Sequence, residues 1–275
     1  MDIGGVALVC GAGSGIGKAV ALQFSSCRVS FLVCADLMIE KARETVQFAK
    51  EFRKEDVAFR DIAMKVDVRN EEEVRRLFAS VKEMAGRIDI CVNTAGFGAS
   101  SSTPLSEMSM ADYRVQVEVH NIGAFVFLRI ALQTMLQQDL HVLPGSRQPT
   151  RGAIVLLTSL ASEGAFIGVG NYTAAKFAVK GLVQTAAIEN ARKGVRINAV
   201  APSYVSGGMM DTFLEQSPNL KQQILGDLAM GRLANPKEVS EAVLFLASSM
   251  SSYINGHTLV LDGGSSLQLA NTLFT

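Results

Sequence analysis

Two residues four positions apart, Tyr172 and Lys176, form the pair in this chain that is best suited to proton transfer. At the start of a helix this spacing puts both side chains on one face. A free phenol has a pKa of about 10 and is a poor base at neutral pH. An ammonium group about 4 Å away would stabilise the phenolate by about 4 kcal/mol, or roughly three pKa units. The spacing therefore predicts a phenol that exchanges a proton near neutral pH. The alternative is that Tyr172 and Lys176 are simply exposed on a helix surface, since such a pair would have the same spacing.

A hydroxyl group precedes this pair at a position where ligands gather. Ser159 directly follows the apolar run Ile154–Thr158, which we expect to be a strand. In open α/β sheets, ligands bind at the carboxyl ends of the strands. A hydroxyl there would hydrogen-bond a substrate oxygen as charge develops on it. We therefore expect Ser159, Tyr172 and Lys176 to act together on a carbonyl or hydroxyl group.

A glycine-rich segment follows the first apolar run and opens a helix. It has the order Gly-x-x-x-Gly-x-Gly, and its members are Gly11, Ala12, Gly13, Ser14, Gly15, Ile16 and Gly17. Glycine permits a tight turn and lets the backbone approach a pyrophosphate, which the N–H groups and the helix dipole then face. The segment predicts a dinucleotide site. A glycine turn that only connects two elements is the alternative.

Asp36 ends the second apolar run and is followed by Leu37. A carboxylate there would bind the adenosine ribose hydroxyls and repel a 2′-phosphate, which favours NAD over NADP. Asp36 would also suit the N-cap of a helix beginning at Leu37, and the two roles can coexist.

The elements that must position these residues alternate along the chain. Near-continuous apolar runs indicate parallel strands buried on both faces, and the segments between them, such as Glu71–Ala85 and Asn171–Arg192, have helical spacing. The runs are Val6–Cys10, Val29–Ala35, Ile62–Val66, Ile88–Asn93, Ile154–Thr158, Val195–Val200 and His257–Leu261. This alternation predicts an α/β fold with a doubly wound, Rossmann-like parallel sheet. Residues 138–152 read as a surface loop, so we expect one domain over residues 1–275.

Composition excludes several classes of protein. The 275 residues carry 26 Lys+Arg and 26 Asp+Glu, so no excess of basic charge points to nucleic acid. The four cysteines form no CxxC pair or metal-ligand cluster, which fits a reducing compartment. The N-terminus lacks the features of a signal peptide, and the apolar runs are too short to span a bilayer. We expect a cytoplasmic protein with no metal and no membrane partner.

A further set of motifs joins these residues in order along the chain. It comprises Gly11-x-x-x-Gly15-Ile16-Gly17, Asp67-Val68, Asn93-Thr94-Ala95-Gly96, Asn121, Ser159, Tyr172-x-x-x-Lys176, Arg196 to Pro202, Gly231 to Gly256 and Asp262-Gly263-Gly264. The chain resembles the short-chain dehydrogenases/reductases over nearly its whole length, and similar members include fungal biosynthetic enzymes. The resemblance implies an NAD(P)-dependent oxidoreductase that acts on a secondary alcohol or ketone.

The resemblance also implies a role for each matched residue. Tyr172 would be the proton donor or acceptor, Ser159 would hold the substrate oxygen, Lys176 would lower the Tyr172 pKa and bind the nicotinamide ribose, and Asn121 would hold a water that relays protons. The cofactor would contact Gly11, Ser14, Gly15, Ile16, Gly17, Asp36, Leu37, Asp67, Val68, Asn93, Ala95, Gly96, Tyr172, Lys176, Pro202 and Val205. An ordinary turn at Asn93 to Gly96 and a polar helix-interior Asn121 are the alternatives.

Three positions depart from the family pattern. Thr94 stands where a second asparagine is usual, Ser203 where a glycine follows the proline, and Gly207 where a threonine helps to fix the nicotinamide carboxamide. Ser206 is the candidate replacement for that threonine. These departures put the orientation of the cofactor in question.

The substrate side of the site is expected to be apolar. Its candidate residues neighbour the motifs or lie in a segment after Gly207 and Gly208, and they are Phe97, Leu160, Phe166, Tyr204, Met209, Met210 and Phe213. In the family this segment, here about 203–228, is a lid over a substrate, which we expect to be bulky and neutral. Packing in the core or at a subunit interface is the alternative for these side chains. Apolar faces on the helices at 104–138 and 171–192 and the family resemblance imply a homo-oligomer, a tetramer or dimer.

Two other functions remain compatible with the sequence. The same Tyr172 would serve a non-redox isomerase, dehydratase or cyclase, and the change at Gly207 leaves room for this. A cofactor-binding regulator without turnover is the second alternative, although it would have no need of Ser159, Tyr172, Lys176 and Asn121.

Overall fold

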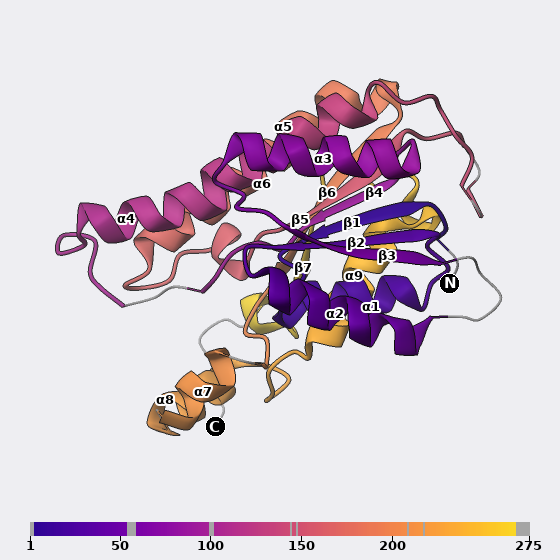
Figure 1. Ribbon diagram of the computed structural model, residues 1–275. Coiled ribbons are helices and arrows are strands. Elements are labelled where there is room, and N and C mark those ends of the chain that lie inside the picture. The colour runs from indigo at the N-terminus through magenta and orange to yellow at the C-terminus, as the bar shows by residue number, and fades with distance from the viewer. Residues whose placement is uncertain are drawn as a thin grey trace.

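Seven parallel strands form one sheet at the centre of the computed structural model (Figure 1). The strands are β1 (Val6–Cys10), β2 (Phe31–Asp36), β3 (Arg60–Lys65), β4 (Ile90–Asn93), β5 (Gly152–Leu157), β6 (Val195–Pro202) and β7 (Thr258–Leu261). Their order in the sheet is β3-β2-β1-β4-β5-β6-β7. The predicted doubly wound parallel sheet is therefore confirmed, and its central strands are buried on both faces, as their apolar runs require.

The structure describes residues 3–53, 59–98, 102–143, 145–146, 148–207, 209–216 and 218–267. Within the segment 209–220, the side chains of Met209, Thr212, Phe213, Gln216, Pro218 and Leu220 also lie outside the description. Every statement below refers to the described part of the chain.

Helices cover both faces of the sheet in two layers (Figure 1). One layer contains α1, α2 and α9, and the other contains α3, α5 and α6. The bounds are α1 (Gly15–Ser25), α2 (Ile39–Phe52), α3 (Glu71–Ala85), α4 (Met110–Gln116), α5 (Gly123–Met135), α6 (Gly170–Asn190), α7 (Met209–Gln216), α8 (Pro218–Asp227) and α9 (Pro236–Ala247). Short 3₁₀ turns are η2 (Leu160–Ser162), η3 (Ala191–Lys193), η4 (Ser249–Ser251) and η5 (Ser265–Leu267). Each layer closes its own apolar core against one face of the sheet.

The helix that crosses the α3 face begins later and is less regular than the sequence suggested. It starts at Met110 rather than near Pro104, passes through a π-helical turn, η1 (Val117–Ile122), and ends at Met135. A π turn inserts one extra residue per turn and often marks a functional site. By length and composition alone, Met110–Met135 would suffice to cross a membrane, but half of its most apolar window is buried within the protein. Its packing against α3, α6 and the sheet is that of a core helix.

The order of the strands places the site. The chain moves outward from β1 to β2 and β3, then returns to the other side of β1 at β4 and continues to β7. The carboxyl ends of β1 and β4 therefore flank the point where the direction reverses, and ligands bind at such a point. The glycine-rich segment follows β1, the Asn93 turn follows β4, and Ser159 follows β5. All the predicted chemistry thus converges on one edge of the sheet.

Candidate active site

The glycine-rich turn after β1 is shaped so that its backbone faces outward. The N–H groups of Gly11 and Ala12 both donate to the Ala35 carbonyl, at 2.8 and 3.1 Å, which ties the turn to β2. A side chain on Gly17 would overlap the Gly11 carbonyl oxygen, so only glycine permits this approach of helix to strand. Ser14 and Gly15 are exposed at the start of α1, where the helix dipole favours an anion. The turn fits the pyrophosphate of a dinucleotide.

Thr94 explains one departure from the family pattern. Its hydroxyl donates to the carbonyl of Cys10, at 2.8 Å, and lies 3.2 Å from that of Gly11. A Cβ atom on Gly11 would lie 2.7 Å from the Thr94 hydroxyl oxygen. Thr94 therefore ties the β4 loop to the glycine turn.

Asp36 is held at the end of β2 by two backbone donors. Its Oδ2 accepts from the Gly13 N–H at 2.8 Å, and its Oδ1 accepts from the Met38 N–H at 2.9 Å. The helix α2 begins at Ile39, after Met38 as N-cap, so a start at Leu37 was wrong. Each carboxylate oxygen retains an acceptor site beside the glycine turn, as the binding of ribose hydroxyls requires.

The remaining residues predicted to bind cofactor lie along the same edge. Asn93 is buried, and its Oδ1 accepts from the Ala95 N–H at 3.0 Å, which fixes the turn toward Gly96. Asp67 is paired with Arg69, whose guanidinium donates three hydrogen bonds to the carboxylate at 2.6 to 3.1 Å and lowers the pKa of Asp67 below its ordinary value. Val68 is buried against Gly123. Its contact is therefore with the helix behind the site.

Ser159, Tyr172 and Lys176 are brought together where β5 meets α6. Ser159 has extended backbone at the end of the strand, and its hydroxyl hydrogen-bonds Tyr172. Lys176 is 5% exposed, and its Nζ donates to the Leu157 carbonyl at 3.1 Å. The same Nζ lies 5.4 Å from the centre of the Tyr172 ring. The predicted proximity of the three side chains is present.

The electrostatics of this cluster differ from the sequence-based expectation. Burial raises the pKa of Tyr172 above its ordinary value of 10.0, and the Ser159 hydrogen bond offsets this only in part. Burial also lowers the pKa of Lys176 to about 7. The expectation that Lys176 brings the pKa of Tyr172 close to 7 was wrong for the free protein. Desolvation acts on both groups, and the lysine hydrogen-bonds the Leu157 carbonyl. Tyr172 is thus a protonated phenol at pH 7.

The π turn adds a histidine, which the sequence analysis had not singled out, to the cluster. His120 is the buried side chain of this turn, at 3% exposure, and its ring lies edge-on to Tyr172 at 5.3 Å between centroids. Its other side faces the Phe97 ring at 5.2 Å. Asn121, one residue later, is only half-buried. The structure therefore brings His120 against Tyr172, and the role of Asn121 in holding a water stays a prediction.

The side chains predicted to line the substrate pocket lie in several elements. Phe97 is half-buried against His120, Leu160 begins the 3₁₀ turn after Ser159, and Phe166 is 36% exposed in the loop before α6. Tyr204 and Met210 pack against a small apolar cluster of Leu214, Ile224 and Leu228. Met209 and Phe213 belong to α7, and their side chains lie outside the described residues, as does Gly208.

The segment after β6 is anchored by backbone bonds. Pro202 is buried at the end of β6, and Val205 forms a bridge with Ala234. The Ser206 hydroxyl donates to the Ala234 carbonyl at 3.2 Å. Gly207 has φ +118°, a conformation that side chains rarely adopt. The backbone conformation of the turn therefore favours a glycine at this position, and the Ser206 hydroxyl already has a hydrogen-bond partner within the protein.

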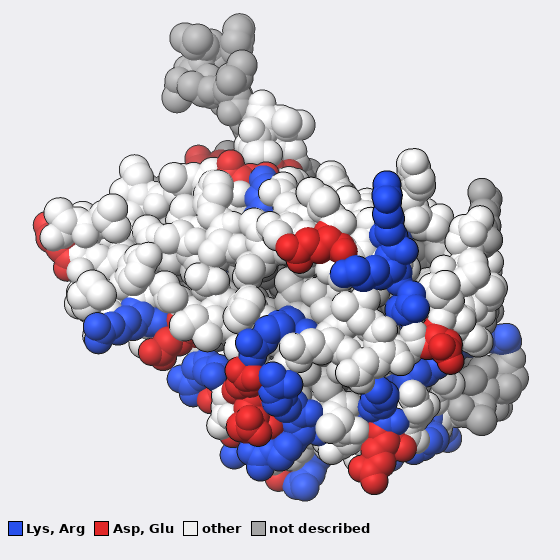
Figure 2. All heavy atoms as spheres, turned by 90° about the horizontal axis from the view of Figure 1, so that it is seen from above, with Lys and Arg blue, Asp and Glu red and all other residues white. Residues whose placement is uncertain are grey.

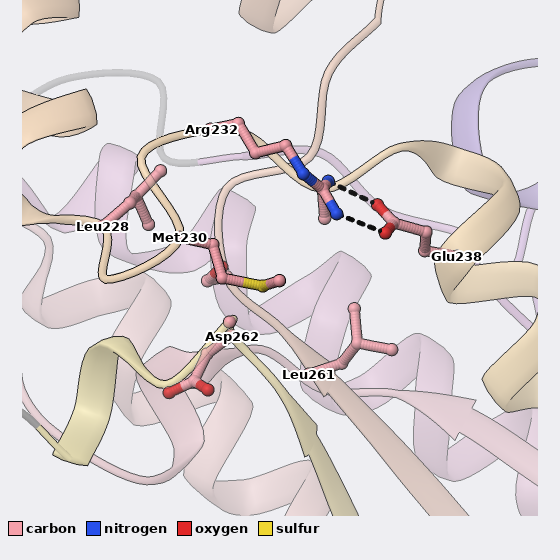
Figure 3. Close-up of a pocket in the computed structure, with 9 residues that line it drawn as sticks. Leu228, Met230, Arg232, Glu238, Leu261 and Asp262 are labelled. Carbon is pink, nitrogen blue, oxygen red and sulfur yellow. Dashed lines mark hydrogen bonds and ion pairs between the residues drawn. The ribbon is translucent and has the colours of Figure 1, made fainter.

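A cavity of about 150 Å³ lies beside this segment, at the carboxyl ends of β6 and β7 (Figure 3). Arg232 and Glu238 form a two-bond ion pair along one wall, at 2.7 and 2.8 Å, while Met230 and Leu261 point inward from two sides. Asp262 accepts from the backbone of Gly264 and Ser266. Tyr172 does not line this cavity, which is bordered by Ser203 and Leu228, at the two ends of the segment 203–228.

Comparisons with known proteins agree with this geometry. A family model described as enoyl-(acyl carrier protein) reductase matches residues 11–266. The short-chain dehydrogenase fogB of Aspergillus ruber is 38% identical, over 97% of this chain and 98% of its own. The chain belongs to the short-chain dehydrogenases/reductases. The short-chain dehydrogenase RED2 of Pyricularia oryzae is also 38% identical, over 97% and 98%.

Solved structures of this family share the whole fold. Levodione reductase superposes with a TM-score of 0.84 at 26% identity, covering 96% of this chain and 98% of its own. A 7α-hydroxysteroid dehydrogenase complexed with NADH and 7-oxo glycochenodeoxycholic acid gives a TM-score of 0.81 at 28% identity, covering 94% and 93%. This chain is accordingly an oxidoreductase of the family that uses NAD(P)(H) and acts on alcohols or ketones.

Proposed function

We propose that this enzyme transfers a hydride between NAD(H) and a secondary alcohol or ketone, with Tyr172 as its acid/base. The observation that supports this most directly is the hydrogen bond between Ser159 and Tyr172, with Lys176 beside them at the carboxyl edge of the sheet. Ser159 would hold the substrate oxygen, and Tyr172 would exchange a proton with it. The bound cofactor would supply or accept the hydride, and its ribose would be held by Lys176.

The pKa values favour ketone reduction as the direction for which the free protein is prepared. Burial keeps Tyr172 protonated at pH 7, so its hydroxyl can donate to a carbonyl oxygen as negative charge develops there. Alcohol oxidation requires the phenolate, which needs a positive charge nearby. Lys176, with a pKa of about 7, can provide that charge only in part at neutral pH.

Asp36 supports NAD as the preferred cofactor. Its two backbone hydrogen bonds fix a carboxylate beside the glycine turn, where the adenosine ribose would lie. A 2′-phosphate would meet this charge at close range. Leu37 and Met38, which follow it, are exposed apolar residues and offer no compensating cation.

The substrate proposed for this site is bulky and mostly apolar. Its pocket would be lined by Phe97, which packs against His120, and by Leu160, Phe166, Tyr204, Met209, Met210 and Phe213. The segment 203–228, with the separate apolar cluster of α7 and α8, would act as a lid. The 7α-hydroxysteroid dehydrogenase, whose complex contains a steroid ligand, supports such a substrate.

We also infer a homo-oligomer in the cytoplasm. Apolar side chains are exposed along α4 to α6, and they include Val115 (48%), Ile122 (45%), Phe125 (43%), Phe177 (46%) and Ile188 (82%). A second copy of the chain would bury them. The face in Figure 2 shows Lys and Arg interspersed with Asp and Glu, which gives no support to a nucleic-acid partner. The four cysteines are buried and free, as in reducing compartments.

The test is turnover with a panel of bulky cyclic and aromatic ketones, followed by loss of NADH absorbance. Tyr172→Phe should abolish turnover while leaving NADH affinity, measured by fluorescence titration, nearly unchanged. Tighter binding of NADPH than of NADH would refute the role of Asp36. Product formation without any change in NADH would favour a non-redox reaction, and turnover by Tyr172→Phe would exclude the acid/base assignment.

A further inference from the structure

His120 is enclosed between two aromatic rings that belong to the active site. The Tyr172 ring meets it edge-on at 5.3 Å, and the Phe97 ring lies at 5.2 Å with a 55° tilt. Gly96 has no room for a side chain, because a Cβ atom there would overlap Cε1 of the imidazole. Any change in this ring would therefore be transmitted to Tyr172.

The hydrogen bond from the Phe97 backbone defines which nitrogen carries the proton. The Phe97 N–H donates to His120 Nε2 at 3.4 Å, so Nε2 must be the unprotonated nitrogen. The proton of the neutral ring is then on Nδ1. Burial and the neighbouring Lys176 lower the pKa of His120 to about 2, which keeps the ring neutral at physiological pH. His120 thus carries one fixed N–H donor.

That donor has no partner among the described residues, and neither does an acceptor on the side chain four positions earlier. His120 Nδ1 and Gln116 Oε1 are both buried without a hydrogen bond. Gln116 is 1% exposed, and its Nε2 donates to the Gly98 carbonyl at 3.3 Å. The two side chains therefore bind adjacent residues of one loop, Phe97 and Gly98, from positions four apart on one helix. A buried donor and acceptor left unpaired are unfavourable, because each has lost its hydrogen bonds to water.

We propose that His120 is a positioning residue of the active site, whose Nδ1–H, together with Gln116 Oε1, holds an enclosed water molecule and so fixes the ring that packs against Tyr172. Enclosed waters typically bind such otherwise unsatisfied groups. A substrate oxygen is the less suitable occupant, because both atoms are closed off from solvent. The inference rests on the proposed function of Tyr172 and adds a residue to it.

Three substitutions separate the two nitrogens of the ring. His120→Asn keeps a donor near the Nδ1 position and loses the acceptor for Phe97. His120→Gln keeps an acceptor near Nε2 and loses the donor, while His120→Phe keeps only the ring. We expect kcat to fall about 100-fold in His120→Phe, as for a misplaced acid/base group. His120→Asn should recover most of this loss and His120→Gln should not, with KM changing less than kcat.

Melting temperatures and NADH titrations of the three variants show whether fold and cofactor site are retained. Activity of His120→Phe equal to that of the wild type, or recovery by His120→Gln and not by His120→Asn, would overturn the proposal. If His120→Phe fails to fold, the comparison of the Asn and Gln variants alone decides it. If the wild type turns over no ketone, the proposed function fails instead.

A spectroscopic test does not depend on turnover. The chain has three histidines, so ¹⁵N-labelled histidine gives a spectrum in which His120→Asn identifies the signal of residue 120. We expect a neutral ring with its proton on Nδ1 at every pH from about 5 to 8. A proton on Nε2, or titration of His120 within this range, would contradict the inference.

Discussion

Lys176 is a buried titratable side chain, and its replacement by an uncharged one should stabilise the protein. Burial lowers its pKa from 10.5 to about 7. At about 1.4 kcal/mol per pKa unit, this difference amounts to about 5 kcal/mol of folding free energy at and below pH 7. Lys176→Met has a similar length and no charge, and it loses one hydrogen bond to Leu157, worth about 1.5–3 kcal/mol. We expect the variant to gain about 2–3 kcal/mol at pH 7.

The sign of the pH dependence follows from the lowered pKa. Between about pH 7 and 10.5 the unfolded chain binds a proton on this lysine that the folded chain does not bind. Stability of the wild type therefore rises with pH over this window, relative to the variant. The advantage of Lys176→Met should shrink by about 2 kcal/mol between pH 7 and pH 9.

Urea unfolding of the cofactor-free protein at these two pH values measures this difference. Lys180→Met is the matched control on the same helix, since Lys180 is partly exposed and pairs with Glu163 at the surface. The stability difference of this control should be the same at pH 7 and pH 9. A difference between Lys176→Met and the wild type that does not change with pH would refute the desolvation of Lys176. Turnover should be lost in the variant at either pH.

Four further substitutions, with Gly181→Ala as a control, test the residues predicted to bind the cofactor and the hydrogen bonds that hold the surrounding fold. Gly17→Ala should unfold at lower urea and lose NADH binding, because its Cβ would overlap the Gly11 carbonyl, whereas Gly181→Ala, with open space around it in α6, should gain about 0.5–1 kcal/mol. Thr94→Val should lose about 1–2 kcal/mol in urea unfolding, since carbonyl acceptors lose their donor. Asp36→Asn should weaken NADH binding about tenfold and narrow the NADH/NADPH preference in fluorescence titrations. Arg196→Met should lower stability by about 3 kcal/mol, because the partly buried guanidinium bonds four carbonyls and one hydroxyl at the end of α9.

The fold could be predicted because strands that are buried on both faces of a sheet are near-continuous apolar runs in the sequence. The runs Val6–Cys10 and Glu71–Ala85 have the same bounds in the sequence analysis and in the structure. Asn70 and Gly86 cap the latter helix at its two ends, and Gly86 takes the left-handed conformation that favours glycine there. The start of the helix at Met110 was not predicted correctly. Ser109 caps the helix there, since its side chain accepts from the Asp112 N–H.

The proton chemistry was predictable in its parts and not in its electrostatics. Spacing along the chain placed Ser159, Tyr172 and Lys176 at one edge of the sheet. The spacing could not show that Lys176 is shielded from water, since the burial of Lys176 depends on β5 and on the helix that packs beside it. Coulomb attraction at an assumed dielectric was therefore outweighed by desolvation, which acts on the pKa of both groups.

The position of His120 beside the site could have been predicted from periodicity. The buried positions of this helix include Gln116, His120, Ala124 and Leu128, a stripe with a spacing of four that runs through the π turn. Asn121 lies beside this stripe, and its predicted role in holding a water stays a prediction. Matching by motif drew attention to Asn121 alone, whereas the helical face also points to His120. Position on the face matters because His120, on this stripe, packs edge-on against the Tyr172 ring while its Nε2 accepts a hydrogen bond from the Phe97 N–H.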